Sequence, residues 1–138
     1  MKKLFACLAL LSATVFAEAK PWSISVSSAG GVTGGGSTTI IRSNGDVVRK
    51  TWSRAGETPK EEVTGQVNSD SLDVLQRLLE NPELRKIDHR RPSNMSRTLT
   101  VQFGDGTKSY TVPANAKFPA PVQHLNDEFA RALKTVKE

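Results

Sequence analysis

The chain has 138 residues, of which 37% are hydrophobic and 24% charged, and a formal net charge of +5. This composition is typical of one compact globular domain with a mildly basic surface. Its single cysteine and two histidines exclude a disulfide framework and leave little for a metal site or general-base catalysis.

The first 19 residues have the pattern of a secretory signal peptide. Lys2 and Lys3 precede an apolar run over 4–16, and Ala17 and Ala19 are the small residues that a signal peptidase reads. The run is too short to span a bilayer comfortably. We therefore predict cleavage next to Ala19, export to the periplasm or the medium, and no membrane anchor in the mature domain over 20–138. Lipid attachment at the cysteine is disfavoured, because too few apolar residues precede it.

The first half of the mature chain predicts strands. Residues 22–27 alternate apolar side chains with serines, the period of a half-buried strand. A glycine-rich segment over 29–36 follows, and then two β-rich runs over 38–42 and 47–52. These runs flank Asn44 and Gly45, the preferred centre of a tight type I′ hairpin turn. Residues 61–67 are a weaker candidate for a further short strand, because Gly65 interrupts them.

The second half predicts a helix, a hairpin and a last helix. Asn68 or Ser69 can cap a helix whose leucines share one face through residue 79. Residues 98–103 and 108–112 form the hairpin, and a terminal helix begins near Val122. Because turns join consecutive strands, we expect an α+β single domain, with an antiparallel sheet of four to five strands and two helices packed on one face. The predicted core residues are Leu75, Leu78, Leu99, Val101, Phe103, Leu125, Phe129 and Leu133.

Two surface segments are candidates for binding. The glycine-rich segment lets a main chain approach another surface closely, although it serves equally well as a structural connection. The stretch over 85–97 is the densest in basic residues and suits an acidic partner, although a solvated loop explains it as well. Its basic side chains are Arg85, Lys86, Arg90, Arg91 and Arg97.

The sequence contains no motif of an assembled active site. It lacks a nucleophile elbow, a paired-histidine zinc motif and a phosphate-binding loop. No aromatic residues are interleaved with the basic stretch, which argues against single-stranded nucleic acid. We therefore expect a protein that is not an enzyme, binds no metal, cofactor or nucleic acid, and is a monomer.

The mature chain resembles the emfourin group, small bacterial proteins that inhibit thermolysin-type metalloproteases. The similarity lies in the strand over 24–26 followed by Gly30 and Gly31, in the leucine-rich helix over 72–79, and in the hairpin over 98–112 before a proline-rich step. It covers nearly all of residues 22–133. The chain differs by the extra glycines over 34–36 and by a polar insertion through residue 62.

The resemblance implies noncovalent inhibition that blocks the substrate cleft of a thermolysin-like metalloprotease. Such an inhibitor needs a segment of close-lying main chain with small side chains. Two segments meet that criterion, the glycine segment over 30–34 and the start of the mature chain over 20–22. Because they flank the same strand from opposite ends, they should lie about 25 Å apart. We favour the glycine segment and expect valine at Gly30 and Gly31 to abolish inhibition with thermal stability nearly intact. The candidate residues are Gly30, Gly31, Val32, Thr33 and Gly34 in one segment and Lys20, Pro21 and Trp22 in the other.

A second hypothesis is a non-enzymatic envelope protein that binds a polyanion or a surface partner through the basic stretch. The two hypotheses predict different responses to salt. An inhibitor should titrate its protease at fixed stoichiometry with little salt dependence, whereas a polyanion binder should lose affinity steeply as salt rises.

Overall fold

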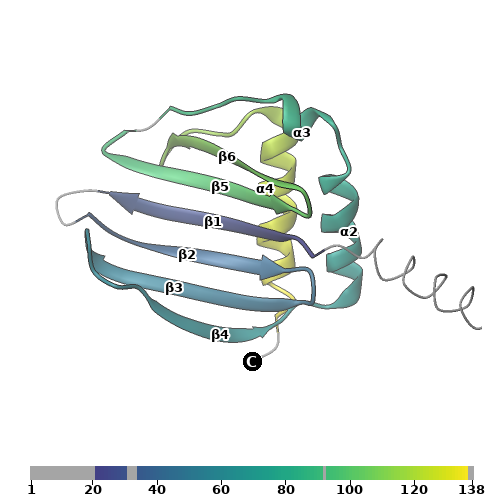
Figure 1. The fold of residues 1–138 in the computed structure, drawn as a ribbon, viewed down its shortest axis with the longest axis horizontal. Helices are drawn as coiled ribbons and strands as arrows, with labels where there is room; N and C mark the ends of the chain where they lie inside the picture. Colours follow the sequence, from purple (N-terminus) through teal and green to yellow (C-terminus); the bar gives the residue numbers. More distant parts are fainter. Residues whose placement is uncertain (1–20, 31–33, 92, 137–138) are drawn as a thin grey trace, which may run out of the picture.

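Six antiparallel strands form one sheet, and the helices each bury residues against the same face of it (Figure 1). This computed structural model describes residues 21–30, 34–91 and 93–136. In chain order the elements are β1 (Ser23–Gly30), β2 (Gly34–Arg42), β3 (Asp46–Arg54), β4 (Lys60–Gln66), α2 (Ser69–Leu79), α3 (Glu83–Lys86), β5 (Met95–Phe103), β6 (Gly106–Pro113) and α4 (Ala120–Leu133).

The sheet has the strand order β4-β3-β2-β1-β5-β6, so β1 lies inside it and pairs with both β2 and β5. The α+β class and the antiparallel sheet are confirmed, but the expected count of four to five strands is wrong. The additional strand is β4, which forms in spite of Gly65. The register between β3 and β4 shifts at Val47 and Val48, and Gly65 pairs with Val47 at this irregularity. A glycine is readily accommodated in a bulged pairing.

The hairpin between β2 and β3 is where the sequence places it, but its turn differs from the predicted type. A type I′ turn needs positive φ at both central residues. Among the described residues only glycines have positive φ, so Gly45 has it (+96°) and Asn44 does not. Gly45 N–H donates to the carbonyl of Arg42 (2.9 Å), and Asn44 Oδ1 accepts from the backbone N–H of Asp46. The three-residue connection is thus a β-turn followed by a left-handed glycine.

Both long helices begin where the sequence indicates. Asn68 caps α2, with its Oδ1 accepting from the backbone N–H of Ser71 (2.9 Å). Pro119 precedes α4, whose buried residues recur at helical spacing on one side. A third helix, α3, is a single turn that follows Pro82, so the count of two helices is also corrected.

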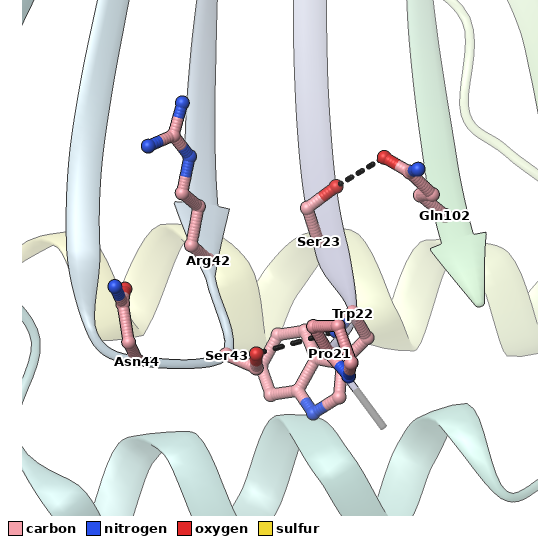
Figure 2. Close-up of a pocket in the computed structure, with 7 residues that line it drawn as sticks. All are labelled: Pro21, Trp22, Ser23, Arg42, Ser43, Asn44 and Gln102. Atoms are coloured by element: carbon pink, nitrogen blue, oxygen red, sulfur yellow. Dashed lines mark hydrogen bonds between the residues drawn. The ribbon is translucent and has the colours of Figure 1, made fainter. Parts of the chain in front are cut away.

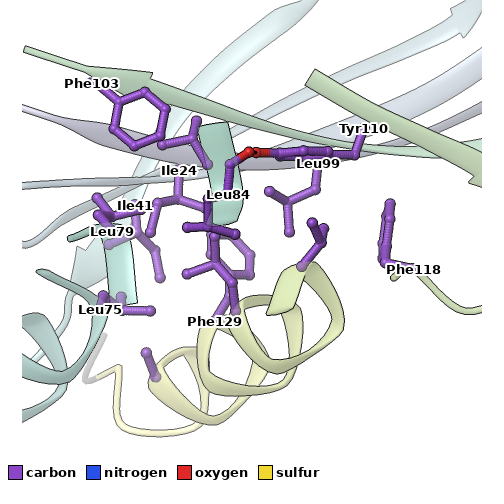
Figure 3. Packing of buried hydrophobic residues seen from close by; sticks show 14 of the residues in the cluster. Ile24, Ile41, Leu75, Leu79, Leu84, Leu99, Phe103, Tyr110, Phe118 and Phe129 are labelled. Atoms are coloured by element: carbon purple, nitrogen blue, oxygen red, sulfur yellow. The ribbon is translucent and has the colours of Figure 1, made fainter. Parts of the chain in front are cut away.

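The core lies between the sheet and the helices (Figure 3). Six of the eight predicted core residues are buried, and Leu78 and Leu133 are partly buried against the same cluster. Other fully buried members were not among the predicted ones. They include Ile24, Ile41, Leu84, Tyr110, Val112 and Val122.

The two edges of the sheet differ. At the β6 edge, residues 88–91 run beside the strand, where Arg91 N–H donates to Thr111 O and Thr111 N–H donates to His89 O (each 2.8 Å). At the opposite edge, β4 carries Lys60, Glu61 and Glu62 in sequence. Charged side chains on an edge strand disfavour pairing with another chain.

Candidate functional site

One end of the sheet extends beyond the helices, and we call it the distal end (Figure 1). It is where β1 ends at Gly30, β2 begins at Gly34 and β5 begins at Met95. Gly30 and Met95 are paired across β1 and β5, and the Met95 side chain is 52% exposed. The candidate residues Gly31, Val32 and Thr33 lie outside the described residues. The glycine candidates therefore flank a segment held between paired strands at an end that no described helix covers.

The backbone conformation at position 30 requires a glycine. Its φ is +125°, a conformation that L side chains rarely adopt, and a Cβ there would lie 2.0 Å from the carbonyl oxygen of Asn94. Valine at this position would therefore strain the pairing of β1 with β5. The expectation that valine at Gly30 leaves thermal stability nearly intact is wrong, because the glycine makes room for a neighbouring strand.

The glycines that open β2 make room for an aromatic side chain. A Cβ at Gly36 would lie 2.3 Å from Ser28 O and 2.8 Å from Cζ2 of Trp52. The indole Nε1 of Trp52 donates to the carbonyl of Gly34 (3.1 Å). Trp52 thus lies against bare backbone on β2, which gives this part of the glycine-rich segment a structural role.

Replacing Gly36 by alanine is expected to lower the free energy of unfolding by about 1–3 kcal/mol, the usual cost of overpacking. The added methyl group has to displace both the β1 backbone and the Trp52 ring. Urea unfolding measures the change. Gly106→Ala is the matched control, because nothing lies within 4 Å of a Cβ at Gly106. Equal stabilities for the two variants would contradict this packing.

The second candidate segment is anchored to the fold. Trp22 N–H donates to Ser43 Oγ (3.2 Å) and Ser43 N–H donates to Trp22 O (2.9 Å), which ties the start of β1 to the turn between β2 and β3. The Trp22 side chain is partly buried against the core, whereas Pro21 is exposed. Lys20 lies outside the described residues. Pro21 and Trp22 lie at the opposite end of β1 from Gly30, as predicted (Figure 1).

A shallow hollow of about 320 Å³ opens beside Trp22 (Figure 2). Ser23 and Gln102 meet at its rim, where Ser23 Oγ donates to Gln102 Oε1 (3.3 Å). Arg42 is the only charged side chain of the lining, and it pairs with Glu61 (3.8 Å). The lining residues are Pro21, Trp22, Ser23, Arg42, Ser43, Asn44 and Gln102.

Two residues of the basic stretch contact groups within the fold. Arg85 forms two hydrogen bonds with the carboxylate of Asp105 (2.8 and 3.2 Å), which raise the pKa of Arg85, and its guanidinium lies 4.2 Å from the centre of the Phe103 ring. Arg97 is half-buried and donates to the carbonyl of Ala116 (2.7 Å). Both guanidinium groups therefore already have partners within the fold.

The remaining basic residues are exposed. Lys86 lies 3.8 Å from Glu83 on α3, and Arg90 and Arg91 lie on the segment beside β6. In the same segment, the hydrogen bond from Lys108 holds the pKa of Asp88 below its usual value. The structure therefore divides the predicted basic patch among α3, the segment beside β6 and a half-buried position on β5.

Within the described ranges, no three acidic, histidine or cysteine side chains are grouped so that they could hold a metal ion. None of the helices in these ranges is long and apolar enough to cross a membrane. A scan against protein-family models finds no match, and a search of curated proteins finds no significant relative.

Proposed function

We propose that the protein is an exported, noncovalent inhibitor of a thermolysin-like metalloprotease, and that its distal end enters the substrate cleft. The observation that carries the proposal is the position of Gly30 and Gly34. They lie at the ends of two paired strands, at the end of the sheet that extends beyond the helices (Figure 1). Main chain with small side chains can lie close to the extended-peptide site of a protease.

The paired strands beside the candidate contact favour inhibition over cleavage. β1 pairs with β2 on one side and with β5 on the other, so the strand before the segment is hydrogen-bonded on both sides. Strands that are already ordered lose less conformational entropy on binding. The exposed Met95 beside Gly30 adds an adaptable apolar side chain to the same end.

The basic stretch supports a polyanion binder less well. Arg85 pairs with Asp105, Lys86 pairs with Glu83 and Arg97 donates to the carbonyl of Ala116, so three of its five cations contact the protein itself. The two functions still differ in their response to salt, and the assay below measures that response.

The test is titration of a panel of thermolysin-like enzymes with the purified protein, at low and high salt. We expect stoichiometric inhibition of at least one enzyme, with little dependence on salt. Substituting tryptophan for Val32 and Thr33 should raise the inhibition constant at least tenfold, because bulky side chains obstruct a narrow cleft. Gln76→Trp, on an exposed position of α2, is the matched control and should inhibit like the parent.

Two results would contradict parts of this proposal. If no enzyme of the panel is inhibited, the inhibitor function is wrong. If the double variant inhibits fully but removal of Lys20 and Pro21 abolishes inhibition, the N-terminal segment is the contact. Trp22 is retained in that truncation because it packs against the core.

A further inference from the structure

The sheet face opposite the helices carries an unusual set of side chains. Paired residues of neighbouring antiparallel strands point to the same face, and the register therefore identifies every outward position. Three adjacent strands, β1, β5 and β6, place mostly hydroxyl side chains outward, and Thr38 on β2 continues them. We call this surface the hydroxyl face: Ser23, Ser25, Ser27, Thr38, Ser96, Thr98, Thr100, Thr107, Ser109 and Thr111.

The hydroxyl groups are organised into pairs across the strands. Ser27 Oγ lies 2.7 Å from Thr38 Oγ1. Thr98 Oγ1 lies 3.1 Å from Thr111 Oγ1, and Thr100 Oγ1 lies 3.0 Å from Ser109 Oγ. Each hydroxyl carries one donor and two acceptor lone pairs, so a pair that shares one proton keeps a second proton and further lone pairs for a ligand.

The hydroxyl face is also without charge. Although 24% of the chain is charged, no outward position of β1, β5 or β6 holds a charged residue. Soluble surfaces ordinarily intersperse both signs of charge. The outward positions of the other three strands do carry both signs of charge, with Arg42 on β2, Lys50 on β3 and Glu61 on β4. A need for solubility therefore explains the outward side chains of β2, β3 and β4 better than it explains those of β1, β5 and β6.

The hollow of Figure 2 adjoins the hydroxyl face at the start of β1, because Ser23 belongs to both and donates to Gln102 on the outward side of β5. Trp22 and Pro21 give it apolar ring surfaces, and Asn44 and Gln102 give it amide groups. Its volume of about 320 Å³ is near the lower end of small-molecule sites. Arg42 and Lys50 share the carboxylate of Glu61 (3.8 and 4.0 Å), which opposes part of the Arg42 charge.

We propose that the hydroxyl face and this hollow bind an uncharged polysaccharide chain. A sugar unit presents C–H faces that suit an apolar ring and hydroxyl groups that suit amides and hydroxyls. An uncharged ligand suits the face because the outward positions of β1, β5 and β6 offer a polyanion no cation, and burying an unpaired charge is costly. The face spans about 20 Å along β1, which accommodates several sugar units. This function is separate from inhibition and would hold the protein at a polysaccharide surface.

The experiment is co-sedimentation of the full mature protein with amorphous cellulose and with chitin, with soluble heparin tested as an anionic glycan by affinity electrophoresis. We expect binding to cellulose or chitin that persists in 1 M NaCl, since the contacts are not ionic, and no retardation by heparin. Ser25→Lys places a charge in the middle of the face and should weaken binding at least tenfold. Gln76→Lys adds the same charge to α2 and should bind like the parent.

Melting temperatures of the variants show whether Ser25→Lys is folded, and Thr98→Ala with Thr100→Ala removes hydroxyl groups without adding charge. The proposal is overturned if neither polysaccharide sediments the protein, if salt abolishes the binding, or if both folded variants bind like the parent. It is also overturned if Ser25→Lys only converts a dimer of the parent into a monomer in size-exclusion chromatography, because the face is then a contact between two copies.

Discussion

Replacing Phe129 by alanine is expected to lower the free energy of unfolding by about 3–5 kcal/mol. Phe129 is 3% exposed and points from α4 into the cluster between the helices and the sheet (Figure 3). Alanine removes the whole ring from an interior that is packed on every side. The cost combines the lost transfer free energy of the ring with the cavity that remains.

Chemical denaturation with urea measures this loss. His124→Ala is the matched control in the same helix, because the His124 side chain is 62% exposed. A surface substitution of this kind should change stability by about 0.5 kcal/mol or less. If Phe129→Ala also falls within that range, the position of α4 against the sheet is wrong.

Local patterns carried enough information to place most elements. The alternation over 22–27 reflects a strand with one covered face, and the leucine spacing in α2 reflects a helix that packs on one side. Both signals come from neighbours in sequence. The β4 strand gave a weaker signal, because its residues are largely exposed and its Gly65 is accommodated only by the bulged pairing with β3.

Long-range pairing was beyond these patterns. No periodicity indicates that β1 pairs with β5, about 70 residues further along the chain, and this pairing is what places Ser25 beside Thr100. The serines of β1 were visible as an alternation, but the hydroxyl face exists only when three strands are assembled. Likewise, the glycines over 34–36 could not be assigned a structural role until Trp52 was placed against them.

Charge clustering in sequence proved a poor guide to charge clustering in space. Arg85 and Arg97 lie within one basic stretch, yet Arg85 pairs with Asp105 and the half-buried Arg97 donates to the carbonyl of Ala116. Their partners lie about 20 residues away in sequence, beyond the reach of a local pattern. The sequence therefore predicted the fold class, while the sheet face and the dispersal of the basic residues required the structure.

Tyr110 should make the protein lose stability between about pH 10 and 12. Its side chain is fully buried and its hydroxyl donates a hydrogen bond to the carbonyl of Leu84 (Figure 3). Burial, assisted by the nearby Asp88 carboxylate, raises the pKa of Tyr110 to about 12. Because the folded-state pKa lies above that of a free phenol, about 10, the stabilisation is complete below pH 10 and is lost as pH rises through 12.

The size of this effect follows from the shift in pKa. Two units correspond to about 3 kcal/mol of unfolding free energy. Tyr110→Phe should lack this part of the pH dependence, and at neutral pH it should be less stable by about 1–3 kcal/mol because the carbonyl of Leu84 loses its donor. Lysines also titrate in this range, so the difference between parent and variant isolates the phenol.

The titration itself can be observed directly, because Tyr110 is the only tyrosine in the chain. The phenolate absorbance of the folded protein should rise near pH 12, and that of the urea-unfolded protein near pH 10. Unfolding curves at pH 8, 10 and 11.5 for the parent and Tyr110→Phe then test the linkage. A phenolate that appears near pH 10 in the folded protein, with parallel stability curves for the two proteins, would show that this hydroxyl is exposed to water and that the contact between β6 and α3 is wrong. A delayed phenolate with converging curves would establish that the hydroxyl is buried against the carbonyl of Leu84, since only the protonated phenol can donate to it.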